Sequence, residues 1–330
     1  RAGRPQHDTH AVACILVHEP KKNFYRKFLH EPFPVESSLH LQLHNHLNAE
    51  VAGGSASSRK DLVEYLTWTY FFRRLLQNPS YYLLDDASPE GLEAHLLGLV
   101  NDTLADLEEN GCVELSPEEV VPGMGGPGAG GVEPTTLGMI ASTYYLDYRT
   151  MGFLRDAFYG RAAARPSAPH DLAELLADAQ EFSELPVRHN EEILNAQLAQ
   201  LLPWPADEHR MDESNTKAFL LLQAHFVRAP LPISDYVNDT RSVLDQAPRV
   251  LQAMVDVAAE EGLLPCVLGL TTLSQMLVQA GMVAAPRGEL RQLPHVSDHV
   301  ADELARRLRR RGDAAEGDGG SGGGVGGGGG

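Results

Sequence analysis

The stretch SPEGLEAHLLGLVNDTLADLEENGCVEL, residues 88–115, shows most directly which fold the chain adopts. Ser88 can cap a helix and Pro89 suits the first helical position, so the stretch predicts a helix that begins there. Apolar residues recur at helical spacing along one side: Leu92, Leu96, Val100, Leu104 and Leu107. Gly111 ends this helix, and residues 112–115 (CVEL) predict a short strand.

Two further helix patterns precede this stretch. The first places an apolar residue at every fourth position over 39–51. The second starts after Ser58 and ends before Asn78, which is followed by proline. Three helices followed by a strand hairpin are typical of a winged helix, and we predict one over residues 31–121.

The second half of the chain has a different pattern. Residues 122–133 are rich in glycine and predict a flexible linker. Beyond it the pattern is helical with little strand signal, which predicts a helical bundle over 134–293 and a mostly α protein. Its helices are expected at 135–159, 170–181, 190–202, 214–229, 239–261 and 266–280. A last helix is expected at 297–311, and the Gly-rich segment 312–330 is expected to be disordered.

The first residues of the chain carry two arginines. Arg1 and Arg4 flank a glycine in RAGRPQ. The apolar run 11–17 predicts a buried strand, and residues 21–29 predict a short basic helix. Because arginines on a tight loop beside a buried strand commonly hold an anion, we interpret RAGRPQ as half of an anion site.

The composition of the chain argues against several classes of protein. The formal net charge is -18, so the overall field of the chain does not attract polyanions, and nucleic-acid contact needs local surfaces. The 3 cysteines lie far apart, which excludes a disulfide framework and favours a reducing compartment. His40 and His44 are spaced like half of a zinc site, but no further ligand accompanies them, so we predict no metal. No apolar stretch approaches the roughly 20 residues that span a bilayer, so we predict no membrane partner.

Seven segments together resemble one helicase family. They are RAGRPQ (1–6), HEPKKNFYRKFLHEPFPVESSL (18–39), YLTWTYFFRRLLQNPSYY (65–82), LGMIASTYYLDYRT (137–150), LPVRHNEE (185–192), TKAFLLLQAHFVR (216–228) and VLDQAPRVLQAMVDVAAEEG (243–262). They are similar to the "Sec sixty-three" module at the C-terminal side of tandem-cassette superfamily 2 helicases of the Ski-two-like branch. Within this branch, they are more similar to the second cassette of cointegrator-complex helicases than to spliceosomal helicases.

The resemblance implies an enzyme of which this chain is one part. Residues 1–30 would be the tail of a second RecA-like α/β domain, and residues 294–311 the start of a helix-loop-helix. The full-length protein would be an ATP-dependent 3′–5′ helicase that uses ATP and Mg²⁺, with Arg1 and Arg4 as an arginine-finger remnant. The chain has no GxxxxGKS or GxxxxGKT loop and no acidic magnesium motif, so we expect the fragment to bind no cofactor and to be inactive alone.

The resemblance also implies where a nucleic-acid strand would lie. Helix 239–261 would run along the strand, and its polar residues Gln246, Arg249 and Gln252 are the binding candidates. Arginine can stack on a base or hold a phosphate, and glutamine can bond a base edge or sugar. Pro248 predicts a kink in this helix that costs about 3 kcal/mol.

Two more basic residues are candidates for phosphate contacts. Arg306 and Arg309 belong to the run RRLRRR (306–311) on the last expected helix. A solvated helix end, whose positive charge suits the helix dipole, is the alternative for this run, and a solvated face is the alternative for helix 239–261.

The implied partners are single-stranded RNA or DNA, the upstream RecA domains and first helicase cassette, and protein subunits of a cointegrator-type complex. The implied location is the nucleus and cytoplasm, and the implied roles are RNA or DNA remodelling, ribosome rescue or DNA alkylation repair. The acidic balance and Pro248 leave open an alternative, a protein-interaction scaffold or regulatory pseudo-cassette without strand contact of its own. The residues do not distinguish RNA from DNA.

Overall fold

The computed structural model describes residues 3, 4, 6–30, 35–116, 131–159, 166–282, 290, 292, 293, 295–297 and 299–307. The elements of the first half are α1 (Lys22–His30), α2 (Leu43–Ala52), α3 (Arg59–Thr67), α4 (Tyr70–Gln77), α5 (Pro89–Glu109), β1 (Val113–Leu115) and β2 (Val132–Pro134). Those of the second half are α6 (Thr136–Tyr144), α7 (Tyr148–Tyr159), α8 (Pro169–Ala177), α9 (Glu191–Ala199), α10 (Ser214–Val227), α11 (Asp235–Glu260) and α12 (Leu264–Gln279), with a further helix at 299–307. The protein is therefore mostly helical, as predicted.

Helices α2 to α5 and the two strands form the winged helix. Ser88 accepts a hydrogen bond of 3.1 Å from the backbone N–H of Gly91 and caps α5, which confirms the predicted start of this helix. Strands β1 and β2 pair antiparallel, with Leu115 opposite Val132. The predicted single helix after Ser58 is instead divided into α3 and α4, because Thr69 caps a new helix through its hydroxyl.

The segment that leads into the winged helix is fixed by one carboxylate. Glu36 accepts hydrogen bonds from Arg74 at 2.7 and 3.1 Å, from Asn78 at 3.0 Å and from Tyr82 at 2.9 Å. The Arg74 guanidinium, with help from Asn78 and Tyr82, lowers the pKa of Glu36 to about 2. The carboxylate therefore stays ionised and holds the chain at this point against α4.

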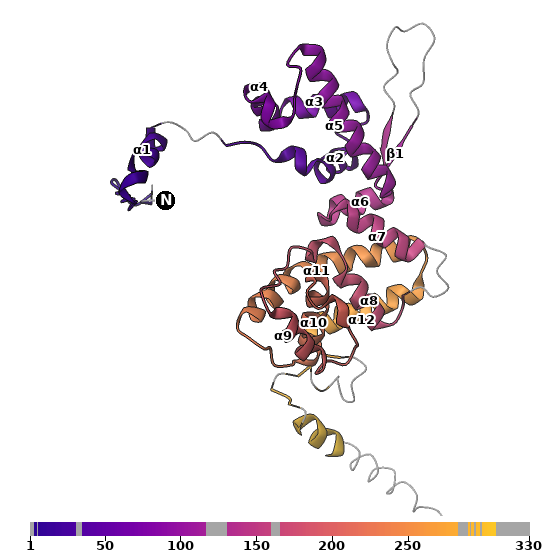
Figure 1. Cartoon of the computed structure of the whole chain (residues 1–330). Coiled ribbons are helices and arrows are strands. Elements are labelled where there is room, and N and C mark those ends of the chain that lie inside the picture. Colours follow the sequence, from indigo (N-terminus) through magenta and orange to yellow (C-terminus); the bar gives the residue numbers. More distant parts are fainter. Residues whose placement is uncertain are drawn as a thin grey trace, which may run out of the picture.

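Helix α10 is the centre of the bundle. Residues 216–224 are all buried, and the helix packs against α8, α9, α11 and α12. Helix α11 remains a single helix through Pro248, whose ring lies on the exposed side. Figure 1 shows the winged helix at one end, the bundle at the other, and α6 and α7 between them.

The predicted long helix 135–159 is wrong, because the chain turns between α6 and α7. Tyr145 adopts a left-handed conformation with φ of 54°, which ends α6. The side chain of Asp147 accepts a 3.0 Å hydrogen bond from the N–H of Arg149, and its backbone carbonyl accepts one from Thr150. Aspartate is a favourable N-cap, so a new helix begins here.

The predicted buried strand at 11–17 is also wrong. These residues form no strand, and Val12 and Leu16 are 91% and 92% exposed. A strand needs a hydrogen-bonding partner, and the only strands among the described residues, β1 and β2, pair with each other. Helix α1 lies apart from the winged helix (Figure 1), and the assignment of residues 1–30 to a RecA-like domain stays a prediction.

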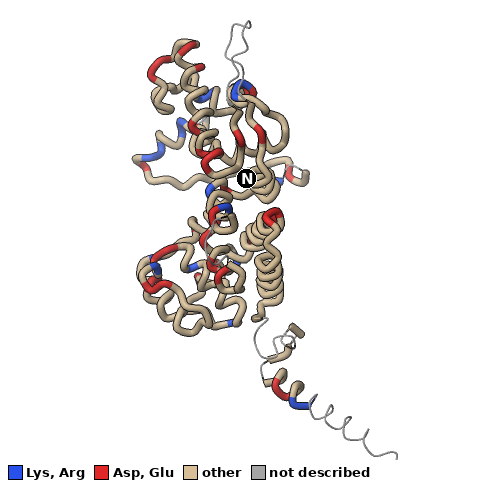
Figure 2. Tube along the Cα trace, turned by 90° about the vertical axis from the view of Figure 1, so that its right-hand side faces the viewer, with Lys and Arg blue, Asp and Glu red and all other residues tan. Residues whose placement is uncertain are grey.

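Several sequence predictions fall on residues that the structure does not describe. They include the tail 312–330 and the linker 122–133, except Gly131 and the two residues that begin β2. Among the described helices, none is both long enough and apolar enough to cross a membrane. Acidic residues are spread over both halves of the molecule and outnumber the basic ones along the chain (Figure 2), in keeping with 45 acidic and 27 basic residues in the sequence.

Candidate nucleic-acid interface

Helix α11 has one polar and one apolar face. Its buried side chains include Val243, Ala247, Val250, Met254 and Val257, which pack into the bundle. Its exposed or half-exposed polar side chains are Ser242, Asp245, Gln246, Arg249, Gln252 and Asp256. The three sequence-predicted candidates Gln246, Arg249 and Gln252 therefore lie on the same face of one helix.

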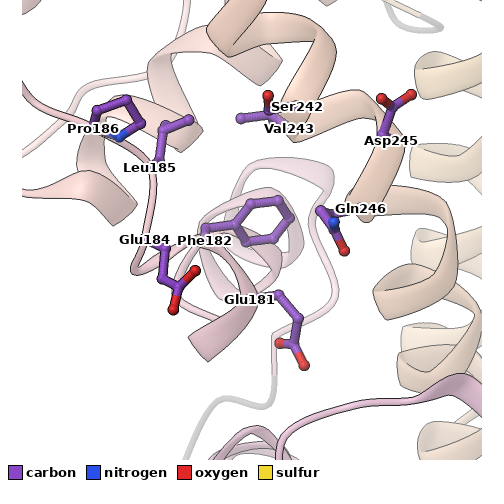
Figure 3. Close-up of a pocket in the computed structure, with 9 residues that line it drawn as sticks. All are labelled: Glu181, Phe182, Glu184, Leu185, Pro186, Ser242, Val243, Asp245 and Gln246. Atoms are coloured by element: carbon purple, nitrogen blue, oxygen red, sulfur yellow. The ribbon is translucent and has the colours of Figure 1, made fainter. Parts of the chain in front are cut away.

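A groove runs from this polar face to the winged helix. It consists of three adjoining cavities of about 290, 300 and 460 Å³ that share lining residues. Glu184 lines all three, Gln246 lines the first two, and Asn45 of α2 lines the last two. In Figure 3, Glu181 and Glu184 lie on one side of the first cavity and Asp245 and Gln246 of α11 on the other. We call this feature the groove.

Arg249 is held in place by the protein. Its Nε donates to Gln246 Oε1 at 2.8 Å, and its Nη1 donates to the backbone carbonyls of Tyr144, at 3.1 Å, and of Tyr145. These carbonyls end α6 and have no helical partner, so the guanidinium serves as their cap. The sequence predicted a side chain available to a base or phosphate, whereas in the structure most of its N–H groups are already used.

Gln252 lies one turn further along α11 and is exposed. Its amide donates to Asp256 Oδ1 at 3.4 Å, a long and weak bond. Asp256 Oδ2 accepts a 2.6 Å hydrogen bond from the Tyr144 hydroxyl, and this bond raises the pKa of Tyr144. The Tyr144–Asp256 hydrogen bond is thus a second contact between the end of α6 and α11, beside that of Arg249. The side-chain amide of Gln252 is only weakly bonded and can rotate toward a ligand.

The charges in the groove are mixed. Arg149 donates to Asp147 at 2.8 Å, and its guanidinium lies 5.7 Å from the ring centre of Tyr148. Burial raises the pKa of Asp147, but the hydrogen bonds from Arg149 and Asn45 outweigh it and lower this pKa below its ordinary value. Glu184 and Asp245 are exposed carboxylates in the same groove. A strand would therefore meet the groove with its bases or sugars rather than with its phosphates.

Family comparisons agree with this architecture. A model of the Sec63 Brl domain matches residues 134–301, and a model of a winged helix-turn-helix domain matches residues 36–117. The chain belongs to the Sec63 Brl domain family. The resemblance predicted from the seven sequence segments is thus confirmed.

The curated relatives of this Sec63 Brl chain include helicase subunits. The chain is 46% identical over 299 residues to the activating signal cointegrator 1 complex subunit 3 of Bos taurus, covering 91% of this chain and 13% of the relative. It is 45% identical over 307 residues to the DExH-box ATP-dependent RNA helicase DExH14 of Arabidopsis thaliana, covering 93% and 13%. It is 37% identical over 300 residues to the human U5 small nuclear ribonucleoprotein 200 kDa helicase, covering 91% and 13%. The chain spans about an eighth of the length of these relatives.

The other predicted site residues that the structure describes do not line the groove of the Sec63 Brl chain. Arg1 and Arg309 fall outside the described residues. Arg4 forms a 3.4 Å ion pair with Asp8 in the exposed N-terminal segment. Arg306 forms a 3.5 Å ion pair with Glu303, on a helix at the far end of the bundle from the winged helix (Figure 1). Among the candidates that the structure describes, Gln246 and Arg249 are therefore brought together at the groove, and Gln252 lies one turn further along α11.

The two histidines considered for zinc have other contacts. His44 lies 2.7 Å from Asp106 and stacks on Tyr148, with ring centres 4.3 Å apart. His40 packs against Phe71 and Tyr82, and its burial lowers its pKa. In the part of the chain that the structure describes, no three metal-ligating side chains come together.

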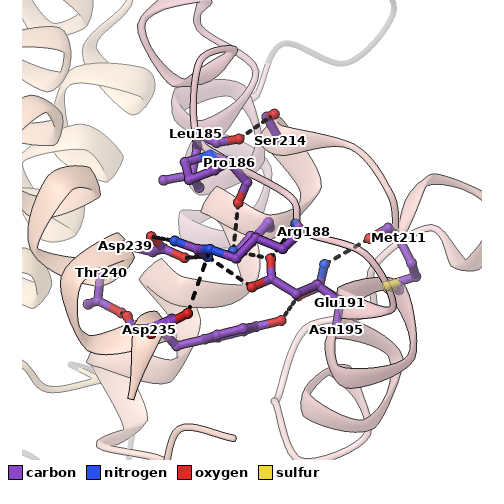
Figure 4. A network of polar contacts seen from close by, with 12 residues as sticks. Leu185, Pro186, Arg188, Glu191, Asn195, Met211, Ser214, Asp235, Asp239 and Thr240 are labelled. Carbon is purple, nitrogen blue, oxygen red and sulfur yellow. Dashed lines mark hydrogen bonds and ion pairs between the residues drawn. The ribbon is translucent and has the colours of Figure 1, made fainter. Parts of the chain in front are cut away.

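Sequence reasoning missed a buried ion network in the bundle (Figure 4). Lys217 of α10 is 0% exposed, and its ammonium lies 2.6 Å from Glu191 and 2.7 Å from Asp239. Arg188 also donates to both carboxylates, at 2.9 and 2.7 Å. Burial raises the pKa of Glu191 and Asp239, but the hydrogen bonds from Lys217 and Arg188 outweigh it and lower both pKa values.

This network joins α9, α10 and α11 and so fixes the N-terminal part of α11, the helix that carries the candidate residues. The signal for it was one lysine in the otherwise uncharged run KAFLLLQA (217–224). A lysine that joins such a run on a fully buried helix is itself buried, and a buried ammonium needs carboxylate partners. Its partners could not be chosen from the sequence, because they come from two distant segments.

Proposed function

We propose that this chain is the strand-guiding part of a helicase cassette. One nucleic-acid strand would lie along the polar face of α11 and enter the groove beside the winged helix. The observation that carries the proposal is that Gln246 and Arg249 line this groove and that Gln252 follows them one turn further along the polar side of α11. Support comes from two relatives that are named helicases.

The chemistry of this face suits a single strand better than a duplex. Amide and hydroxyl groups such as those of Gln252 and Ser242 can bond the Watson–Crick edges of bases, which are accessible only in unpaired strands. The exposed carboxylates Glu184 and Asp245 repel phosphates, so the backbone would face outward. In this proposal, motion comes from upstream RecA domains that bind ATP and Mg²⁺ outside this chain. The first cassette and cointegrator-type subunits would be its protein partners, in the nucleus and cytoplasm.

The residues of this chain do not fit an ATP–magnesium site of their own. The sequence has no phosphate-binding loop. Arg4 pairs with the carboxylate of Asp8, and no other residue that could bind a nucleotide is described beside it. Arg4 could contribute to such a site only together with another domain, where its charge would stabilise the phosphoryl oxygens.

The test is binding of short fluorescein-labelled oligonucleotides, followed by anisotropy at low salt. We expect the chain to bind a single strand in preference to the matching duplex. Gln252→Ala should weaken binding about fivefold, since one hydrogen bond contributes about 1 kcal/mol. Gln275→Ala is the matched control, because Gln275 is equally exposed but lies on α12. Absence of single-strand binding by the unmodified chain would overturn the proposal.

A protein partner is the second candidate, and the two exposed carboxylates in the groove favour it. Glu184 and Asp245 would attract a basic peptide but repel a phosphate backbone. The double variant Glu184→Gln and Asp245→Asn separates the two candidates. It should strengthen oligonucleotide binding if a strand lies in the groove, and it should weaken capture of a basic partner if a protein does.

A further inference from the structure

We infer that Tyr145 is a base-stacking platform at the rim of the groove and that Arg249 is the residue that positions it. This inference rests on the proposed strand-guiding function and adds a contact to it. Tyr145 was not among the sequence-predicted site residues, because it seemed to lie inside a continuous helix at 135–159. The turn between α6 and α7 is what places it at the groove.

Tyr145 is both exposed and conformationally unusual. Its side chain is 85% exposed, and its backbone is left-handed with φ of 54°. Residues at this helix-ending position are commonly glycine or asparagine, because a bulky side chain is strained there. At Tyr145 this left-handed backbone holds an aromatic ring in solvent beside the groove, whereas at Leu83 the same conformation lies outside it.

The backbone around Tyr145 is held from both sides. The Arg249 guanidinium donates to its carbonyl and to that of Tyr144, at 3.1 Å for the latter. The next residue, Leu146, is buried and donates a 2.9 Å hydrogen bond to the carbonyl of Ala141. With its backbone fixed by these contacts, the ring of Tyr145 is presented from a rigid base.

The surroundings of the ring are those of a ligand surface rather than of a core. Tyr145 lines the 300 Å³ cavity together with Gln246, Arg249 and Glu184, all of them polar. An exposed aromatic ring in a cavity lined by polar side chains offers a face on which a base can stack. Stacking on a base needs no positive charge. This suits the groove, because Arg149 is already bonded to Asp147 and Arg249 to the carbonyls at the end of α6.

The experiment replaces the ring without harming the fold. Tyr145→Gly relieves the left-handed strain, so its thermal midpoint should equal or exceed that of the unmodified chain. Its affinity for a labelled oligouridylate should fall roughly 5- to 150-fold, the range for loss of one base–aromatic stack. Tyr145→Phe should keep the affinity.

Leu83→Gly is the matched control. Leu83 is also left-handed, with φ of 57°, is 83% exposed and lies on the winged helix outside the groove. This variant should gain stability in the same way and bind oligouridylate like the unmodified chain. If the unmodified chain binds and Tyr145→Gly binds equally well, the inference is overturned while the proposed function stands. If the unmodified chain does not bind oligouridylate at all, the inference on Tyr145 and the proposed function are both overturned.

The positioning role of Arg249 is tested by a double-mutant cycle. Arg249→Gln should weaken binding when Tyr145 is present and should have little further effect in the Tyr145→Gly background. The salt dependence of binding reports how many phosphates the protein contacts. Arg249→Gln should leave it unchanged, because in this account Arg249 holds the backbone at Tyr145 and does not contact a phosphate. Additive losses or a reduced salt slope would overturn this role.

Discussion

The side-chain amide of Asn48 in α2 donates a 3.0 Å hydrogen bond to the backbone carbonyl of Gly138 in α6. Both residues are buried, and they join the winged helix to the helix that ends at Tyr145. A Cβ atom on Gly138 would lie only 2.0 Å from the carbonyl oxygen of Cys112. The close approach of α6 to Cys112 and to Asn48 therefore requires glycine at position 138.

Gly138→Ala should destabilise the protein. The added methyl group would force α6 away from Cys112, and overpacking of this kind costs about 1–3 kcal/mol. Urea denaturation would measure the change in the free energy of unfolding. Gly98→Ala in α5 is the control, because no atom lies within 4 Å of its Cβ position and alanine should stabilise the helix by up to about 1 kcal/mol. Equal stability of the two variants would contradict the predicted close contact.

Lys217→Met should have a larger effect on stability. It leaves the buried carboxylates of Glu191 and Asp239 with Arg188 alone, and removal of one member of a buried ion network costs about 3–5 kcal/mol. Lys60→Met, on the exposed surface of α3, should change stability by less than about 0.5 kcal/mol. A Lys217→Met protein as stable as the unmodified one would show that the network contributes little.

Stability should fall in acid. The pKa values of Glu191 and Asp239 are lower in the folded protein than in the unfolded chain, so the unfolded chain binds more protons below about pH 5. Their contribution is fully present above the unfolded pKa values and is lost as the pH falls through the folded ones. Urea midpoints at pH 7 and pH 4 would measure this, and the difference should be smaller in Lys217→Met. A stability that rises toward pH 4 would contradict the assignment.

The sequence predicted the elements whose signals are local. Ser88 and the leucine repeat identified α5 together with its cap, and the helical pattern over 239–261 identified most of α11. Such signals depend on neighbours within one or two helical turns, which the sequence displays directly.

Features that depend on distant partners could not be predicted in this way. The turn at Tyr145 lies in a segment with continuous helical spacing, and it forms because Arg249 and a buried Leu146 stabilise the break. The partners of Lys217 lie 26 and 22 residues away along the chain. The run 11–17 has the composition of a strand, but a strand forms only where another strand can pair with it.

Crosslinking tests the central claim most directly, because it reports where a strand lies. A single-stranded oligonucleotide that contains 4-thiouridine would be bound to the chain, irradiated with ultraviolet light, and the crosslinked peptides identified by mass spectrometry. We predict crosslinks in residues 137–150, which include Tyr145, and in 242–256 of α11. Crosslinks confined to the basic segment 21–29 or to the arginine-rich run 306–311, with none along α11, would contradict the account.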